Sequence, residues 1–294
     1  MQPESIKGYF RRVVMRWYLV VLAGAMLLML GCKNDRVAVV RVSTDADAAT
    51  CAEDSLTGVV EEEELANQPM PASAEKLFDD FFFNFASSRQ LQMERIVFPL
   101  KVNSGYKVEE IQKDDWKMER FFMNDEGYTL IFDSQEQMER VKDTSVGEAI
   151  VEKIFLDREF VKQYLFNRDN GRWMLSEVRN QTLPKNPNAS FIAFYHQFVT
   201  DSVFQQASLS DEIEFTGPDP EDEFEQMEGF ITPNLWEDFA PELPQGILYN
   251  IVYGRQSADS TQKILVLRGI ANGLEEELTF VRKDGQWKLT KLVR

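Results

Sequence analysis

Residues 166–178 read FNRDNGRWMLSEV, and residues 280–292 read FVRKDGQWKLTKL. An offset of 114 residues (280 minus 166) pairs Phe166 with Phe280, Arg168 with Arg282, Gly171 with Gly285, Trp173 with Trp287 and Leu175 with Leu289. Each stretch contains Asn-Gly or Asp-Gly, residues that tolerate the positive φ of a type I′ turn between two strands. The sequence therefore predicts the same β-hairpin twice.

The repeat continues upstream of both hairpins without a gap. The same offset pairs Ile150 with Ile264, Val151 with Leu265, Leu156 with Ile270, Phe160 with Leu274 and Tyr164 with Leu278. Every second residue from Phe160 to Phe166 falls on one side of an extended chain, which is typical of a half-buried strand. Each copy is expected to end in at least three antiparallel strands.

Both copies also begin alike. Aromatic and apolar residues recur at helical spacing in Leu77, Phe78, Phe81, Phe82 and Phe85, and again in Phe191, Phe194, Tyr195 and Phe198. This spacing predicts a long helix with one apolar face. The fold class is therefore α+β, with two domains at residues 71–183 and 184–294, each a long N-terminal helix packed on a curved antiparallel sheet.

The first 32 residues have the order of an export signal. Four basic residues precede an apolar run from Trp17 to Leu30, which is shorter than the roughly 20 residues that span a bilayer. The segment from Leu27 to Cys32 resembles the lipobox of bacterial lipoproteins. The resemblance implies cleavage of residues 1–31 and lipid on Cys32, with an uncleaved membrane anchor as the alternative. The residue directly after Cys32 is Lys33 rather than Asp, which favours the outer membrane, at its periplasmic face or at the cell surface.

The segment at residues 32–70 is expected to be an acidic, disordered tether. It contains the run Glu61 to Glu64 and little periodicity, which is typical of a solvated spacer, although a docking tag is an alternative interpretation. The chain carries a net charge of -17, and removal of residues 1–31 leaves 28 basic and 48 acidic residues, or -20. This charge argues against nucleic acid as a partner.

A long helix across a strongly bent antiparallel sheet resembles the nuclear transport factor 2-like, or cystatin-like, cone. Two such cones behind a lipobox are similar to a family of Bacteroidales envelope lipoproteins known as domain of unknown function 4348. The Phe-rich helix and the Gly-x-Trp hairpin carry this resemblance, which covers roughly residues 71–294. It implies tandem cones and brings no established activity or catalytic residue.

Catalytic motifs are absent from the sequence. The only histidine is His196, and no HExxH, GxSxG or P-loop pattern occurs. His196, in the second helix, is read as a histidine at the edge of the core, and a candidate ligand pocket lined by Tyr195 and His196 is the alternative hypothesis. No catalytic residue, cofactor or metal site is assigned.

Two further features have open interpretations. The acidic loop that contains Asp219, Glu221, Asp222, Glu223, Glu225 and Glu228 is read as a solvated loop, with Ca²⁺ binding as the alternative. Trp173 and Trp287 are read as packing residues, with sugar stacking as the alternative. The function favoured is noncatalytic protein or glycan binding, or scaffolding, by a lipid-anchored envelope protein. A small-molecule pocket in the second domain is the alternative, and a hydrolase or isomerase that uses His196 comes third.

Overall fold

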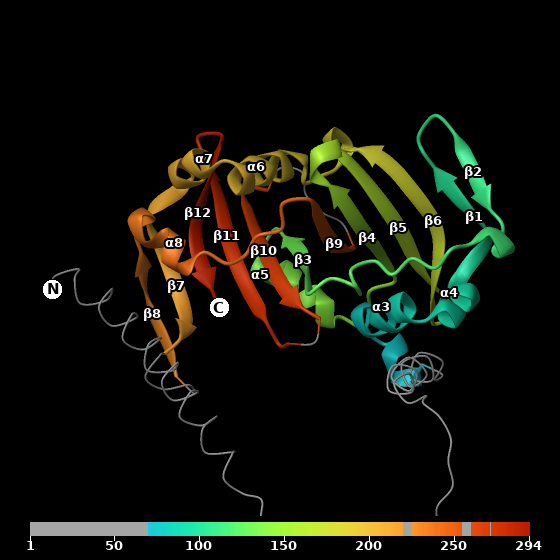
Figure 1. The fold of residues 1–294 in the computed structure, drawn as a ribbon. Helices are drawn as coiled ribbons and strands as arrows, with labels where there is room; N and C mark the ends of the chain where they lie inside the picture. Colours follow the sequence, from blue (N-terminus) through green and yellow to red (C-terminus); the bar gives the residue numbers. More distant parts are fainter. Residues whose placement is uncertain (1–69, 220–224, 255–259, 271) are drawn as a thin grey trace, which may run out of the picture. The chain divides into compact units, whose positions relative to one another are not determined.

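The computed structural model describes residues 70–219, 225–254, 260–270 and 272–294 (Figure 1). The predicted signal peptide, Cys32 and all but the last residue of the predicted tether lie outside these residues. Within the described part of the chain, no helix has both the length and the hydropathy needed to cross a membrane.

The described residues form two six-stranded sheets with helices in addition, so the fold is α+β (Figure 1). The first sheet has the order β2-β1-β6-β5-β4-β9 and consists of β1 (Ile96–Asn103), β2 (Val108–Ile111), β4 (Glu148–Phe155), β5 (Phe160–Asp169), β6 (Arg172–Thr182) and β9 (Ile247–Tyr253). The second sheet has the order β3-β10-β11-β12-β7-β8 and consists of β3 (Gly127–Phe132), β7 (Leu209–Pro218), β8 (Gln226–Ile231), β10 (Gln262–Gly269), β11 (Glu275–Lys283) and β12 (Gln286–Val293).

The predicted hairpins are confirmed in both sheets. β5 pairs with β6 and β11 with β12, both antiparallel, and both turns have positive φ at their two central residues. The φ angles are 47° at Asn170 and 80° at Gly171, and 50° at Asp284 and 79° at Gly285. Trp173 and Trp287 thus lie at matched places in two separate sheets.

Each predicted long helix is in fact two consecutive helices. The first pair is α3 (Phe78–Ser87) and α4 (Arg89–Arg95), and the second is α6 (Ala189–Thr200) and α7 (Ser202–Ala207). The break falls at Ser88 and at Asp201, whose side-chain oxygens accept hydrogen bonds from backbone N–H groups of the following helix. A capping side chain of this kind favours a new helix start over continuation. The four-residue helices α5 (Gln135–Met138) and α8 (Trp236–Phe239) lie in the connections.

The sheets are mixed, which corrects the expectation of antiparallel sheets. β1 pairs with β6 in parallel, and β12 pairs with β7 in parallel, while the other neighbours are antiparallel. Only a short turn between strands forces antiparallel pairing. β1 and β6 are separated by most of the first half of the chain, so their direction is free to be parallel.

One strand of each half belongs to the sheet of the other half. β3 precedes β4 in the chain but pairs with β10, and β9 precedes β10 but pairs with β4. The two exchanged strands also touch, since the Thr129 hydroxyl donates to the Tyr249 carbonyl at 2.6 Å and accepts from its N–H at 3.1 Å. The predicted boundary between residues 183 and 184 falls between β6 and α6, but the sheets do not divide the chain there.

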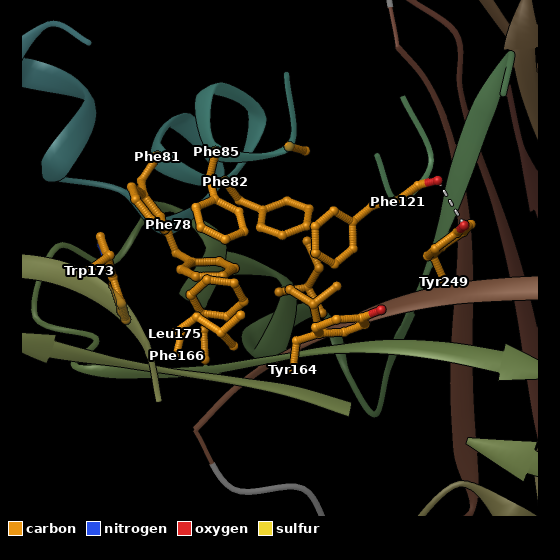
Figure 2. Close-up of a cluster of buried hydrophobic side chains, with 14 of the residues drawn as sticks. Phe78, Phe81, Phe82, Phe85, Phe121, Tyr164, Phe166, Trp173, Leu175 and Tyr249 are labelled. Atoms are coloured by element: carbon orange, nitrogen blue, oxygen red, sulfur yellow. Dashed lines mark hydrogen bonds between the residues drawn. The ribbon is translucent and has the colours of Figure 1, made fainter. Parts of the chain in front are cut away.

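Aromatic side chains fill the space between each sheet and its helices. In the first core, Phe78 of α3 packs edge-on against Trp173, with ring centroids 4.9 Å apart, and against Phe166 at 5.3 Å (Figure 2). In the second core, Phe191 of α6 meets Trp287 at 5.5 Å and Phe280 at 5.3 Å. The Phe-rich helix and the Gly-x-Trp hairpin therefore make the same contact twice.

The exchanged strands contribute to both cores because successive side chains of a strand point to opposite faces. In β3, Leu130 and Phe132 belong to the first core and Ile131 to the second. In β9, Ile251 belongs to the first core and Leu248 to the second. The two cores are thus joined through these strands.

Candidate functional site

Features present in both copies are accounted for by the shared fold, so a functional site is expected among features that only one copy has. A shared example is a Gln–Trp pair: the Trp116 Nε1–H donates to the Gln92 side chain at 3.0 Å, and the Trp236 Nε1–H donates to the Gln205 side chain at 3.2 Å. Both glutamines follow the helix break of their copy. The pair fastens the segment after β2 or β8 to the helices in the same way in both halves.

On the helix-facing side of the first sheet, two lysines and a glutamate form a charged cluster that has no counterpart among the described residues of the second sheet. Lys153 of β4 and Lys162 of β5 are paired across the two strands. The Glu119 carboxylate lies between them, with Oε1 3.6 Å from Lys153 Nζ and Oε2 3.7 Å from Lys162 Nζ. The Tyr164 hydroxyl donates to Glu119 Oε2 at 2.6 Å. Three charges and a phenol thus meet at the edge of an aromatic core.

The cluster is partly accessible to solvent. The side chains of Lys153, Glu119 and Lys162 are 19%, 24% and 33% exposed. Burial would raise the pKa of Glu119, but the Tyr164 hydroxyl and the two lysines outweigh it and lower the pKa. Burial, together with the charge of Lys153, lowers the pKa of Lys162. The Glu119 carboxylate is therefore held in its ionised form. The positive charge of Lys162 is stabilised less well by its surroundings.

The second copy replaces this cluster with other chemistry. The offset of 114 places Leu267 at the position of Lys153 and Glu276 at the position of Lys162. Leu267 is buried in the second core, and Glu276 forms an ion pair with Arg294 at 2.6 Å. The two-lysine arrangement is therefore not required by the duplicated fold.

The predicted pocket residues face different surroundings. Tyr195 is wholly buried, burial raises the pKa of its phenol, and its hydroxyl donates to the Pro244 carbonyl at 2.9 Å. His196 is at the surface, with its side chain 35% exposed and its Nε2 3.4 Å from Oδ1 of Asp157. Adjacent side chains of a helix point about 100° apart, and at this position Tyr195 faces the core while His196 faces solvent. Tyr195 replaces Phe82 of the first copy as a core residue.

The two matched tryptophans are packing residues. Trp173 and Trp287 are buried, and each is covered by the arginine of its own hairpin. The guanidinium carbon lies 4.8 Å from the ring of Trp173 for Arg168, and 5.3 Å from the ring of Trp287 for Arg282. No ring face is left for a sugar, so the stacking alternative is wrong.

The acidic loop falls partly outside the described residues, since residues 220–224 are not included. Among the residues that are described, no group of three or more His, Cys, Asp or Glu side chains is arranged to hold a metal ion.

A second titratable cluster joins the two halves of the chain. The Tyr253 hydroxyl of β9 donates to the carboxylate of Asp79 in α3, and Arg268 of β10 lies 3.9 Å from the same carboxylate. Burial raises the pKa of Asp79 to about 6, against the opposing effects of Tyr253 and Arg268. An acid with a raised pKa binds its proton more tightly in the folded state than in the unfolded chain.

We expect Asp79→Asn to change the pH dependence of stability. The unfolded carboxyl ionises near 3.8 and the folded one near 6, so the free energy of unfolding of the parent falls as pH rises between these values and is level above them. Two pKa units correspond to up to about 3 kcal/mol. The amide keeps an oxygen for Tyr253 but does not titrate. Urea titrations from pH 4 to 7 measure the difference, with Asp114→Asn, at an exposed aspartate, as the control. Parallel profiles for Asp79→Asn and the parent would contradict the assignment.

Comparison with known proteins shows which family has this architecture. A family model described as a domain of unknown function, DUF4348, matches residues 57–294. The chain belongs to this family. The DUF4348 chain is similar to an NTF2-like protein from Bacteroides fragilis NCTC 9343 whose crystal structure is known. The two sequences are 40% identical, the match covers 76% of the DUF4348 chain and 98% of the crystallised chain, and the structures superpose with a TM-score of 0.70. The predicted resemblance to a DUF4348, NTF2-like protein is thus confirmed. No curated protein matches the chain.

Membership of the DUF4348 family does not identify a functional site. The lysine cluster was not predicted from the sequence. A signal was present: Lys162 is the one charged residue in the alternating series Phe160, Lys162, Tyr164, Phe166, on the side predicted to be buried. A charge on the apolar side of a strand indicates either a satisfied ion pair or a site. Glu119, its partner, comes from a distant loop and could not be found by spacing.

Proposed function

We propose that the chain is an exported, lipid-anchored protein of the outer membrane that binds a protein or glycan partner without catalysing a reaction. Residues 1–31 act as the signal peptide and Cys32 carries the lipid. Residues 32–70 act as an acidic tether that holds the folded part away from the bilayer. The support for the anchor is the basic, apolar and Gly-Cys order of the first 32 residues. The protein faces the periplasm or the outside of the cell.

We further propose that the folded part consists of tandem cones at residues 71–183 and 184–294. Each cone has its own helix pair and the sheet formed mainly by its own strands. The equivalent order of elements in the two halves supports this division, and β3 and β9 are the strands that the cones exchange.

The observation that carries noncatalytic binding is the filling of both helix-facing cores by aromatic side chains. Phe81, Phe82 and Phe85 are wholly buried in the first core (Figure 2). Phe191 and Phe198 are wholly buried in the second core. Space taken up by packed rings is not available to a substrate. Recognition of a partner through the outer surfaces and rims is therefore favoured. A small-molecule pocket, or a hydrolase or isomerase site, at Tyr195 and His196 is disfavoured because Tyr195 is part of the packed core.

The test compares the full chain with Cys32→Ala in the native envelope. The parent is expected to incorporate radiolabelled palmitate, to fractionate with the outer membrane and to crosslink to a defined envelope protein or glycan. The variant is expected to lose the label and at least nine tenths of its membrane association, because a thioether to diacylglycerol needs the thiol and stable anchoring needs more than one acyl chain. Labelling of the variant would refute the anchor, and the absence of any saturable crosslink in the parent would refute the binding role.

A further inference from the structure

The lysine cluster lies between a buried core and an aromatic rim. On the helix-facing side of the β4–β5 ladder, the paired residues are Val151 with Tyr164, then Lys153 with Lys162, then Phe155 with Phe160. The first pair is buried, whereas Phe155 and Phe160 are half-buried, with ring centroids 5.9 Å apart. The two ammonium groups are therefore reached past a pair of rings.

Polar groups extend the same row across the sheet. Lys162 is paired with the half-buried Asn180 of β6, and Lys153 with Tyr249 of β9. The Tyr249 ring lies 5.6 Å from Lys153 Nζ, and its hydroxyl is occupied by donation to the Phe121 carbonyl at 2.9 Å (Figure 2). The row thus offers ammonium and amide donors next to apolar rings.

The charges of the cluster do not balance. Lys153 and Lys162 share the single carboxylate of Glu119, at 3.6 and 3.7 Å, which leaves one positive charge in excess. Arg158, at the rim, adds another cation with its guanidinium carbon 5.6 Å from the Phe155 ring. In a chain whose net charge is -17, a local positive excess on a partly exposed face attracts an anion.

We propose that this face binds the carboxylate of an acidic sugar of the uronic acid type. The carboxylate pairs with Lys153 and Lys162, and the C–H face of the sugar packs on Phe155 and Phe160. Glu119 occupies the neighbouring position and competes with the ligand for the lysines. The inference rests on the proposed binding function and names a ligand class for it.

The experiment is calorimetric titration of the purified folded chain with sodium D-glucuronate at fixed ionic strength. Glu119→Gln keeps an oxygen for the Tyr164 hydroxyl but removes the competing charge, and we expect glucuronate to bind it at least tenfold more tightly than the parent, about 1.4 kcal/mol. The double variant Lys153→Met with Lys162→Met is expected to lose binding. The matched control is Lys101→Met with Lys142→Met, which removes two exposed lysines and should bind as the parent does.

Each result decides the proposal. Equal affinity of Glu119→Gln and the parent, or unchanged binding by the Lys153 and Lys162 double variant, would overturn it. Glucose should produce no heat, and N-acetylglutamate binding as tightly as glucuronate would replace the sugar with an acidic peptide and also overturn it. Near-ultraviolet circular dichroism verifies that each variant is folded. The titration uses purified protein, so its result does not depend on whether the protein crosslinks to a partner in the envelope. Failure of this proposal can therefore be distinguished from failure of the proposed function.

Discussion

Residues 70–183 expressed without the second half are expected not to fold into a cooperative unit. The first sheet would lack β9, which pairs with β4 at seven positions from Ala149–Tyr253 to Phe155–Ile247. The first core would lose the buried side chains of Tyr249, Ile251 and Tyr253, each of which contributes roughly 1.5 to 3 kcal/mol by burial. A domain stable by about 5 to 15 kcal/mol does not survive this loss. The open edge of β4 would also favour aggregation.

The measurement is thermal and urea unfolding of the fragments 70–183 and 184–294, alone and after co-expression, beside the intact 70–294 chain. Co-expressed fragments are expected to assemble one to one, since each supplies the strand that the other needs. A sharp unfolding transition with ordered aromatic signals from either fragment alone would show that the exchanged strands are dispensable.

The repeated parts of the fold could be predicted because their signals are local. Asn170 and Gly171 favour a type I′ turn through their own tolerance of positive φ, and the same is true of Asp284 and Gly285. The helical spacing of Phe78, Phe81, Phe82 and Phe85 can likewise be recognised within a few turns of one helix. The helix breaks were not predicted, because Ser88 and Asp201 stop a helix by capping the next one, and an apolar stripe continues across such a break.

The strand exchange could not be predicted, since it depends on a choice between two similar partners. β3 and β9 are both short apolar runs, and either one could pair with β4 or with β10 by hydrophobicity alone. The segments before them also differ in length, so Trp116 and Trp236 lie 120 residues apart rather than 114. Their identical hydrogen bonds to Gln92 and Gln205 are visible only in the structure.

The candidate site illustrates a limit of reasoning from residue types. A histidine beside a tyrosine suggested chemistry at Tyr195 and His196, whereas helix geometry turns the two side chains apart. The lysine cluster of the first sheet could be predicted only by knowing which face of the sheet the helices cover. Lys153 lies next to Glu152 in the chain, and only the pleat of β4 decides that Lys153 faces the helices and Glu152 the opposite side.

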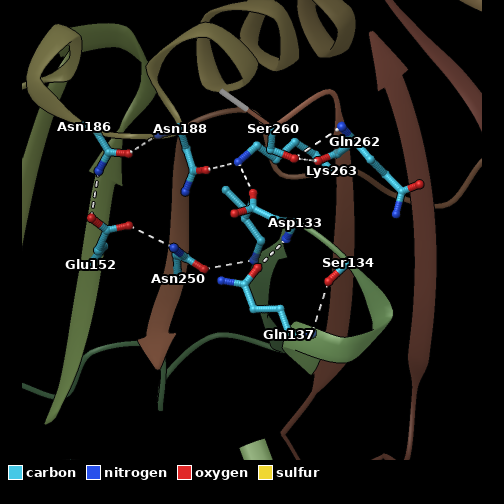
Figure 3. A network of polar contacts seen from close by, with 11 residues as sticks. Asp133, Ser134, Gln137, Glu152, Asn186, Asn188, Asn250, Ser260, Gln262 and Lys263 are labelled. Atoms are coloured by element: carbon cyan, nitrogen blue, oxygen red, sulfur yellow. Dashed lines mark hydrogen bonds and ion pairs between the residues drawn. The ribbon is translucent and has the colours of Figure 1, made fainter. Parts of the chain in front are cut away.

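That opposite side holds a buried polar network at the joint between the halves. The Glu152 carboxylate accepts hydrogen bonds from the side-chain amides of Asn186 at 2.7 Å and Asn250 at 2.8 Å (Figure 3). It also accepts from the side-chain amide of Gln163 at 2.8 Å. Asn250 in turn accepts from the backbone N–H of Ile131 at 2.9 Å, which links β9 to β3. The carboxylate is wholly buried, and burial raises its pKa against the effect of these donors.

A continuation of this network anchors the start of α6. Asn186 accepts from the backbone N–H of Asn188 at 2.8 Å, and Asn188 accepts from Lys263 of β10 at 2.6 Å (Figure 3). Lys263 also forms an ion pair with Asp133, which follows β3. These contacts form a continuous path from Glu152 to Asp133, which crosses from one sheet to the other through side chains and the backbone N–H of Asn188.

Glu152→Ala is expected to lower the free energy of unfolding by about 3 to 5 kcal/mol, because three buried amide donors lose their acceptor and each costs roughly 1 to 3 kcal/mol before any water enters. Glu152→Gln should cost less, about 1 to 3 kcal/mol, since its oxygen still accepts from two donors while its NH₂ group faces that of Asn250. Asn250 cannot turn over to relieve this contact, because its oxygen is needed by the N–H of Ile131. The matched control is Glu148→Ala, an exposed glutamate on the same strand and the same face, which should change stability by less than about 0.5 kcal/mol. Urea unfolding of the 70–294 chain at pH 7 measures all three. Equal stabilities for Glu152→Ala and Glu148→Ala would mean that the joint between the halves is held by its apolar contacts alone.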